Sequence, residues 1–469
     1  MAITTTNTSA AVQSSSVPAA TYGPALTVLT TLFFIWGSLT SLNDVLIPFA
    51  QHVFSLNLAE SMLIQTAFFL AYFIISLPAA KIIDWIGYKR AIIVGLSTMV
   101  AACLLVYPAA SIPSFPFFLS ALMILASGIT VLQVAANPYV AVLGRPETAS
   151  SRLNLTQAFN SLGTAVFPWV GARLILGETV SAAAQASSQD AVIKLYVYFF
   201  AIVLVLLAIL FAVFKLPRIE AAERKSGQQV NDSIWKHPNL PLGAIGIFVY
   251  VGAEVAIGSS IANYLALDNI GHFSGDIADP AARYHAALAI GARYISIYWL
   301  GAMVGRFIGS AVLQKVKTSR VLAFCAAVAA LLVVVTVLTS GYFALWTVLS
   351  IGLFNSIMFP SIFTSGIAEL GPLTGDGSGL LNMAIVGGAV IPWVVGRVGD
   401  AVNHAYYPNM IQGETSWGQG IHYALILTAF CYLYILYYAV SGSKPNSERY
   451  GPAKPAGPRT SSNPSGARS

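Results

Sequence analysis

Residues 321–340 read VLAFCAAVAALLVVVTVLTS, twenty consecutive positions without a charged side chain. A helix of about 20 such residues crosses the hydrocarbon core of a bilayer. Hydrophobic residues make up 57% of the 469-residue chain and charged residues only 9%, whereas soluble domains carry about 25% charged residues. A soluble chain of this length would need a polar surface that this composition cannot supply. The sequence therefore predicts an all-α membrane protein.

Further apolar runs of similar length follow one another along the chain. We expect twelve transmembrane helices, near residues 25–50, 58–82, 90–108, 115–142, 152–176, 193–216, 241–268, 286–314, 320–340, 342–370, 376–400 and 419–441. A polar, charged stretch from Pro217 to Pro238 separates the first six spans from the last six. The predicted organisation is a tail (1–24), a six-helix bundle (25–216), a linker (217–240), a second six-helix bundle (241–441) and a C-terminal tail (442–469). Both tails are rich in small and polar residues, and we expect them to be disordered.

The basic residues predict the orientation. Lys and Arg cluster between spans two and three, four and five, six and seven, and eight and nine, and again after span twelve. With twelve spans these loops all lie on one side, which the positive-inside rule makes cytoplasmic. We expect a bacterial inner (cytoplasmic) membrane protein with both termini inside. The formal charge of +6 is thus accounted for by membrane loops, and we expect no nucleic-acid partner.

The two halves repeat each other. Span four contains Gln133-Val-Ala-Ala-Asn-Pro138, and span ten contains Asn355-Ser-Ile-Met-Phe-Pro360, with an amide five positions before a proline in each. Pro168-Trp169 in span five is matched by Pro392-Trp393 in span eleven, again followed by an arginine at the same spacing. Parallel repeats of six helices, with the substrate between them, describe the major facilitator architecture.

Uncharged polar side chains at membrane depth are candidate solute contacts. An amide offers both a donor and an acceptor, which is what sugar hydroxyls require. Gln157 and Asn160 share one face of span five, as Gln133 and Asn137 share one face of span four. Interhelical hydrogen bonding is the alternative role. The candidate substrate contacts are Asn43, Gln65, Gln133, Asn137, Gln157, Asn160, Asn355 and Asn382.

Two acids also lie inside predicted spans, Asp44 in span one and Glu254 in span seven. Ionisable groups at this depth are costly to insert and are candidates for function. Each acid can bind a proton or cation, or accept hydrogen bonds from a sugar. The structural alternative for Glu254 is an interhelical pair with Arg306.

The loop between spans two and three reads Asp84-Trp-Ile-Gly-Tyr-Lys-Arg90. A glycine turn flanked by one acid and two bases favours a charge lock at a cytoplasmic helix end, formed by Asp84, Gly87, Lys89 and Arg90. An ordinary positive-inside loop is the alternative.

The sequence indicates no metal, cofactor or catalytic cluster, and we expect a transporter, not an enzyme. The six histidines are scattered over loops and span ends, and Cys103, Cys325 and Cys431 lie in apolar spans. A sugar sensor with this fold is a further alternative, although no sizeable signalling domain accompanies the spans.

Longer motifs resemble the fucose permease branch of the major facilitator superfamily, which contains fucose, galactose, glucose and N-acetylglucosamine transporters. The resemblance extends from about Phe33 to Asp400 and is carried by Leu42-Asn-Asp-Val-Leu-Ile-Pro48, Gln133-Val-Ala-Ala-Asn-Pro-Tyr139, Arg152-Leu-Asn-Leu-Thr-Gln-Ala-Phe-Asn-Ser-Leu-Gly163, Val251-Gly-Ala-Glu-Val-Ala-Ile-Gly258 and Gly352-Leu-Phe-Asn-Ser-Ile-Met-Phe-Pro360.

This resemblance implies a proton- or cation-coupled sugar symporter that works by alternating access. Asp44 matches the family's coupling acid in span one, and Gln157 matches its sugar-binding glutamine in span five. The family's second acid, a glutamate in span four, is replaced here by Gln133, which cannot titrate.

We therefore expect a monomeric importer of a hexose of the glucose/galactose class, driven by H⁺ or Na⁺. The alternatives are transport of N-acetylglucosamine or fucose, uncoupled facilitated diffusion, and transport of a non-sugar solute.

Overall fold

The computed structural model describes residues 22–54, 63–112, 114–171, 194–217, 232–267, 269–271, 280–406 and 418–450. All regular secondary structure in these ranges is helical. The helices of the first half are α1 (Tyr22–Phe54), α3 (Leu63–Ser111), α4 (Phe115–Val142), α5 (Ala149–Gly171) and α7 (Ala201–Val213), the last preceded by a π-helical segment, Lys194–Phe200.

The second half begins with α8 (Asn239–Leu265), α9 (Pro280–Val312) and α10 (Thr318–Leu338). Three spans are each divided in two: α11 (Gly341–Asn355) with α12 (Met358–Gly366), α13 (Thr374–Met383) with α14 (Gly387–Tyr406), and α15 (Gly418–Ala424) with α16 (Ile426–Tyr437). A short helix, α17 (Asn446–Tyr450), follows.

The described residues contain ten stretches long and apolar enough to cross a bilayer. One of them, Leu63–Ala109, has 47 residues and is long enough for two crossings. It changes direction at Gly87, whose φ of 78° and ψ of 165° are not helical and are accessible at low cost only to glycine. The remaining predicted span corresponds to α5, whose polar residues lower its mean hydropathy.

Glycines permit a close helix crossing at equivalent places in the two halves. Where α1 meets α5, a Cβ on Gly37 would lie 2.2 Å from the carbonyl oxygen of Asn160, and one on Gly163 would lie 2.4 Å from that of Phe34. Where α8 meets α14, a Cβ on Gly387 would lie 2.0 Å from the carbonyl oxygen of Phe248. Spans one and five thus approach as spans seven and eleven do, which is the close packing that small residues permit in membranes.

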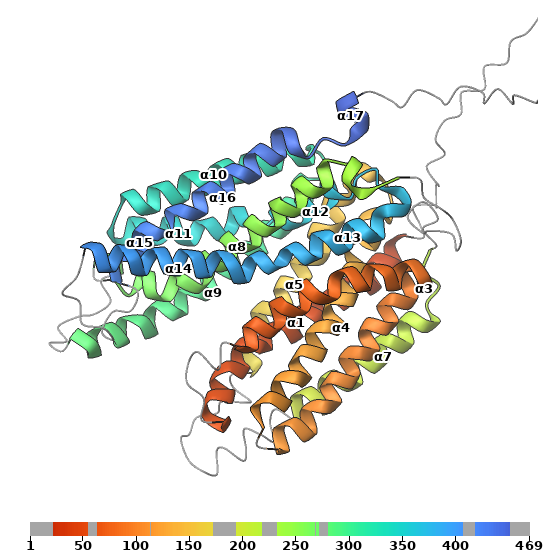
Figure 1. The fold of residues 1–469 in the computed structure, drawn as a ribbon, viewed down its shortest axis with the longest axis horizontal. Coiled ribbons are helices and arrows are strands. Elements are labelled where there is room, and N and C mark those ends of the chain that lie inside the picture. The colour runs from red at the N-terminus through yellow and green to blue at the C-terminus, as the bar shows by residue number, and fades with distance from the viewer. Residues whose placement is uncertain are drawn as a thin grey trace, which may run out of the picture.

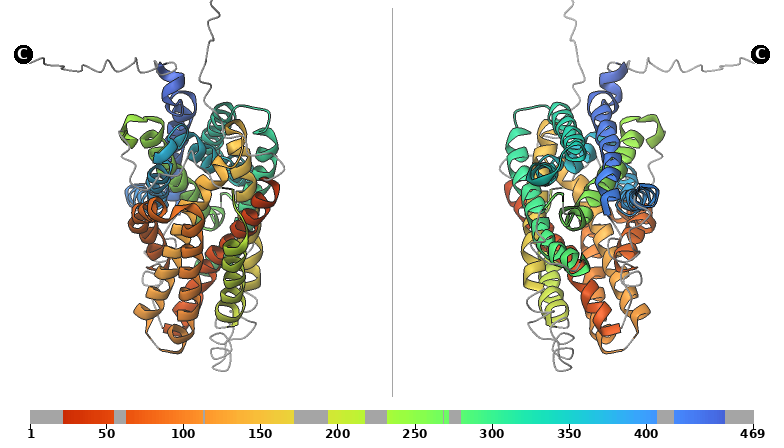
Figure 2. Two further views of the ribbon diagram at one scale, coloured as in Figure 1. Left: turned by 90° about the vertical axis from the view of Figure 1, so that its right-hand side faces the viewer. Right: turned by 90° about the vertical axis from the view of Figure 1, so that its left-hand side faces the viewer.

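The two halves form two groups of helices that lie side by side in every view (Figures 1 and 2). The groups meet beside α3 and α13 and diverge toward the opposite end (Figure 1). The groups meet at the end that carries residues 214–217, 232–238, 313–317 and 367–373. We call it the linker end.

Both predicted tails contain a few helical residues at the end that adjoins the bundles, where we expected disorder. Residues 446–450 form α17, and residues 22–24 belong to α1. The α17 segment is held by its polar side chains: Asn446 donates to the carbonyl of Lys236 at 3.0 Å, and the Ser447 hydroxyl contacts the Glu369 carboxylate. These long-range contacts cannot be read from composition. Residues 1–21 and 451–469 lie outside the described residues.

Candidate functional site

Hydrogen bonds across the linker end join the two halves. Ser150 of α5 and Thr364 of α12 approach with 2.6 Å between their hydroxyl oxygens, and the Ser151 hydroxyl donates to the carbonyl of Ser310 in α9 at 2.7 Å. The Ser378 hydroxyl of α13 donates to the carbonyl of Val134 in α4 at 2.8 Å. Most of these partners are uncharged, so each contact is individually weak and the interface can separate.

The repeated prolines explain two of the acceptors near this interface, one that bonds across it and one that bonds within the second half. A proline inside a helix has no N–H, so the carbonyl four residues earlier loses its helical donor. Pro138 leaves the Val134 carbonyl free for Ser378. Pro360 leaves the Ser356 carbonyl free, and it accepts a hydrogen bond from Nε of Arg306 at 3.2 Å.

Arg306 extends from α9 across the interface to α5. Its Nη1 donates to the carbonyl of Gln157 at 3.3 Å and also to the Ser161 hydroxyl. Asn154 of α5 donates in return to the carbonyl of Arg306 at 2.7 Å. The face of α5 that carries the candidate sugar residues is therefore bonded to the other half.

The repeated amides occupy equivalent positions in the two halves. Gln133 donates to the hydroxyl of Tyr72 at 2.7 Å, and Asn355 donates to the hydroxyl of Tyr298 at the same distance. These pairs join span four to span two and span ten to span eight. The internal repeat seen in the sequence thus extends to side-chain contacts.

Glu254 lies in a polar cluster inside the second half, with 9% of its surface exposed. The Tyr250 hydroxyl donates to its carboxylate at 2.7 Å, and the Tyr298 hydroxyl donates to its backbone carbonyl at 3.4 Å. A buried carboxyl group beside a hydrogen-bond donor is a candidate for binding and releasing a proton.

The remaining candidate amides differ in exposure. Asn137, Asn355 and Asn382 are fully buried, and each leaves one amide atom without a hydrogen-bond partner. In this conformation none of the three offers surface to a solute. Gln65 and Asn160 are partly exposed, and Asn160 donates to the carbonyl of Phe33 at 3.0 Å.

Gln133 and Gln157 are nearly buried, and Gln157 donates to Asn137 at 3.5 Å. The side chains of Asn43 and Asp44 lie outside the described part of the structure, although their backbone belongs to α1. The roles assigned to these amides and to Asp44 stay predictions.

The loop at residues 84–90 contacts both its own half and the other one. Asp84 borders Gly375 of α13, where an added Cβ would lie 3.3 Å from the carboxylate. Lys89 donates to the carbonyl of Ala212 within its own half at 3.0 Å, and Arg90 is exposed.

In the described part of the chain, Lys81 forms an ion pair with the other half, with its Nζ 2.7 Å from Asp376, and it also lies 3.8 Å from Asp84 of its own half. Sequence reasoning missed Lys81 because it precedes the motif by one helical turn. Its spacing of three from Asp84 was the available signal.

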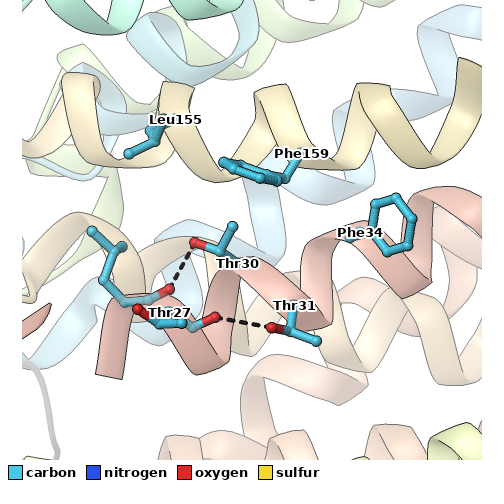
Figure 3. A pocket seen from close by; sticks show the side chains of 7 residues that line it. Thr27, Thr30, Thr31, Phe34, Leu155 and Phe159 are labelled. Atoms are coloured by element: carbon cyan, nitrogen blue, oxygen red, sulfur yellow. Dashed lines mark hydrogen bonds between the residues drawn. The ribbon is translucent and has the colours of Figure 1, made fainter. Parts of the chain in front are cut away.

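A groove of about 400 Å³ lies between α1 and α5 (Figure 3) and is lined by Leu26, Thr27, Thr30, Thr31, Phe34, Leu155 and Phe159. The threonine hydroxyls are engaged within their own helix; Thr30, for example, donates to the carbonyl of Leu26 at 2.7 Å. The groove therefore presents mainly hydrocarbon and lacks the free donors that a sugar needs.

In the described residues no group of three or more His, Cys, Asp or Glu side chains is placed to hold a metal ion. The expectation that no cofactor is bound stays a prediction.

This chain is similar to known transporters. The family model of the Major Facilitator Superfamily matches residues 7–392. The glucose/galactose transporter of Brucella abortus biovar 1 (strain 9-941) is 48% identical over 423 residues, which cover 90% of this chain and 95% of that protein. The L-fucose-proton symporter of Escherichia coli (strain K12) is 31% identical over 401 residues, 80% of this chain and 87% of that protein.

Among solved structures, the fold is similar to that of the transporter FucP in the outward conformation. The TM-score is 0.76 at 28% identity, and the match covers 90% of this chain and 100% of that one. These similarities confirm the predicted all-α major facilitator fold. The chain belongs to the Major Facilitator Superfamily and, within it, to the fucose permease branch.

Proposed function

We propose that this protein imports a hexose of the glucose/galactose class together with a proton, by alternating access. The observation that carries the proposal is the 48% identity to a glucose/galactose transporter over 90% of this chain. The polar faces of α4 and α5 supply the amides that a sugar requires. We assign no catalytic role to any residue and expect the protein to act as a monomer in the bilayer.

The surroundings of Glu254 favour a proton over a sodium ion as the coupling ion. The Tyr250 hydroxyl contacts its carboxylate as a hydrogen-bond donor, whereas a sodium ion would need oxygen ligands. A proton adds to the carboxylate without needing further oxygen ligands, and buried Glu residues serve as proton relays in other transporters.

We further infer that the linker end faces the cytoplasm. Lys and Arg are concentrated in the loops at this end, and such an excess characterises cytoplasmic loops. In this orientation the two halves are joined on the inside and diverge toward the outside, so the structure is the outward-facing state. The inner membrane of a bacterium is the matching location.

The test is uptake of a panel of radiolabelled sugars into proteoliposomes, with proton and sodium gradients imposed separately. We expect glucose or galactose to accumulate under an inward proton gradient. Glu254→Gln and Asp44→Asn should each lose gradient-driven accumulation while retaining sugar exchange, if each acid takes part in coupling.

Glu147→Gln, which changes an exposed acid in the loop after α4, is the matched control and should behave as the wild type. Accumulation driven by sodium alone would overturn proton coupling. Equilibration of sugar without accumulation would identify a facilitator, and the absence of any sugar movement would refute the function.

A further inference from the structure

A groove of about 350 Å³ lies between α3 and α7, which pack together at the outer edge of the first half (Figure 1). Two of its aliphatic side chains, Val205 and Ile209, expose 41% and 54% of their surface. Since both helices cross the membrane, these side chains face lipid. The groove is lined by small and branched aliphatic residues: Ser97, Val100, Val205, Ala208, Ile209 and Ala212.

The groove extends from the linker end into the bilayer. After the turn at Gly87, α3 leads away from the linker end, whereas α7 leads toward it and ends at Val213. Lys89 donates to the carbonyl of Ala212 at 3.0 Å, so these two residues lie at one level. Val100 follows eleven residues later, which is roughly 16 Å along the helix. One leaflet of the hydrocarbon core is about 15 Å deep, so the groove has the length of an acyl chain.

Basic side chains surround the end of the groove that lies at the linker end. An ammonium has three N–H donors, and the bond from Lys89 to α7 occupies one of them. Arg90 comes next in α3 and Lys215 follows α7, and both are exposed. Residues 85–111 and 194–217 contain no Asp or Glu. The charge that these two helices contribute at this end is therefore positive.

Trp85 indicates the depth of these bases in the membrane. Its side chain is 79% exposed, and it lies about one helical turn before Lys89. Tryptophan is enriched at the membrane–water interface, where its ring sits at the level of the lipid headgroups. The bases therefore lie where a lipid phosphate would be, and the groove lies where the acyl chain would be.

We propose that the groove between α3 and α7 binds one phospholipid with an anionic headgroup. One acyl chain lies along the groove, and Lys89, Arg90 and Lys215 bind the headgroup. A zwitterionic headgroup carries its own cation, for which these two helices offer no carboxylate. Each Lys or Arg near the headgroup should tighten the binding of an anionic lipid about fivefold.

The occupied groove would stabilise the first half without hindering the transport cycle. Both of its helices belong to that half, so a bound lipid moves with the half and does not bridge the interface that must open. The groove residues all come from α3 and α7, whereas the candidate sugar contacts Gln133 and Gln157 belong to α4 and α5. The lipid site is thus separate from the proposed sugar site.

The experiment is native mass spectrometry of the purified, delipidated full-length protein, titrated with phosphatidylglycerol or with phosphatidylcholine of the same acyl chains. We expect the first phosphatidylglycerol to bind at least about fivefold more tightly than the first phosphatidylcholine. Raising the ammonium acetate concentration should reduce this preference, because salt screens the headgroup charge. Equal affinities for the two lipids would overturn the proposal.

Substitutions separate the basic end from the groove itself. Lys89→Gln and Lys215→Gln should each weaken phosphatidylglycerol binding about fivefold and leave phosphatidylcholine binding unchanged. Ala208→Phe places a ring in the groove and should weaken the binding of both lipids. Leu206→Phe is its matched control, because Leu206 is 60% exposed on α7 and does not line the groove. We expect this control to bind both lipids as the wild type does.

Lys315→Gln and Arg320→Gln are the charge controls, since each removes an exposed base from the second half. Both should keep the wild-type affinity for phosphatidylglycerol. A loss as large as that of Lys89→Gln would reduce the effect to net charge and overturn the proposal, as would wild-type binding by Ala208→Phe. Competition by glycerol phosphate, which has no acyl chain, would identify a site for soluble anions instead of lipid.

Thermal unfolding provides a second measurement and verifies that each variant is folded. Phosphatidylglycerol should raise the Tm of the wild type, because a ligand that binds the folded state stabilises it. The increase should be smaller for Lys215→Gln, whose exposed side chain makes it the safer variant if Lys89→Gln fails to fold. An equal increase in the wild type, Lys215→Gln and Ala208→Phe would place the stabilising lipid elsewhere and refute the proposal.

Discussion

At the scale of single residues, glycines set how closely the helices of each half can approach. The α1–α5 crossing brings the backbone of one helix against that of the other at Gly37 and Gly163. The same helices carry Asn160 and the candidate contacts Asn43 and Asp44. The position of the candidate sugar site therefore depends on two positions without a Cβ.

Replacing Gly163 by valine should destabilise the protein by at least the 1–3 kcal/mol typical of overpacking, because its Cβ would meet the Phe34 carbonyl at 2.4 Å and the Ser38 hydroxyl at 2.8 Å. Thermal unfolding in detergent, followed by fluorescence, should show a lower Tm. Gly23 on α1, where nothing lies within 4 Å of an added Cβ, supplies the control, and Gly23→Ala should leave the Tm unchanged. An unaltered Tm for Gly163→Val would mean that the crossing is looser than this structure shows.

At the scale of elements, short polar contacts fasten the segment before α8. Asp232 accepts hydrogen bonds from Nε2 of His237 and from the backbone N–H of Ser233, each at 2.8 Å. The hydrogen bond from His237 holds the pKa of the Asp232 carboxyl below its ordinary value. This turn leads the chain from the linker into the second half.

The lowered pKa of Asp232 fixes the pH dependence of this turn. The ionised Asp232 carboxylate stabilises the turn fully above the ordinary aspartate pKa of about 3.9, and this contribution is lost as the pH falls through the lowered pKa. Amide hydrogen exchange of residues 233–237, corrected for intrinsic rates, should show equal protection at pH 7 and pH 5.

Asp232→Asn should speed this exchange by up to about fivefold, the range of exposed ion pairs. Asp376→Asn, which lies elsewhere at the linker end, should leave it unchanged. Protection that falls in the wild type between pH 7 and pH 5 would assign the turn to another titrating group.

At the scale of the whole molecule, alternating access requires the linker end to separate in every cycle. Among the described residues, the contacts there include hydrogen bonds and the ion pair between Lys81 and Asp376, which can be broken at modest cost. The glycine crossings, by contrast, lie within each half. Each half is thus built to move as a unit against the other.

A covalent bond across the linker end should therefore stop transport. Ser150→Cys with Thr364→Cys, in a background without native cysteines, places two thiols where the hydroxyl oxygens are 2.6 Å apart. We expect oxidation to form the cross-link and abolish sugar uptake, and reduction to restore it. Either single variant, oxidised in the same way, should retain uptake. Undiminished uptake by the fully cross-linked protein would exclude opening at this end.

The sequence alone determined the fold class, the twelve spans and the repeat. A bilayer requires every backbone group to be satisfied within a helix, so long apolar runs have one interpretation. Pro138 and Pro360 marked equivalent positions, and Gly87 marked the turn between spans two and three, because both residue types act on the local backbone.

The tertiary structure alone decided which polar side chains meet. Lipid is as apolar as a helix interface, so hydropathy does not reveal which face of a span points inward. The sequence could therefore not show that Asn137, Asn355 and Asn382 are buried in this state, nor that Lys81 pairs with Asp376 of the other half. From the sequence, Arg306 was predicted only as a possible structural partner of Glu254. Its hydrogen bonds to the other half became visible only in the packing of α9 against α5.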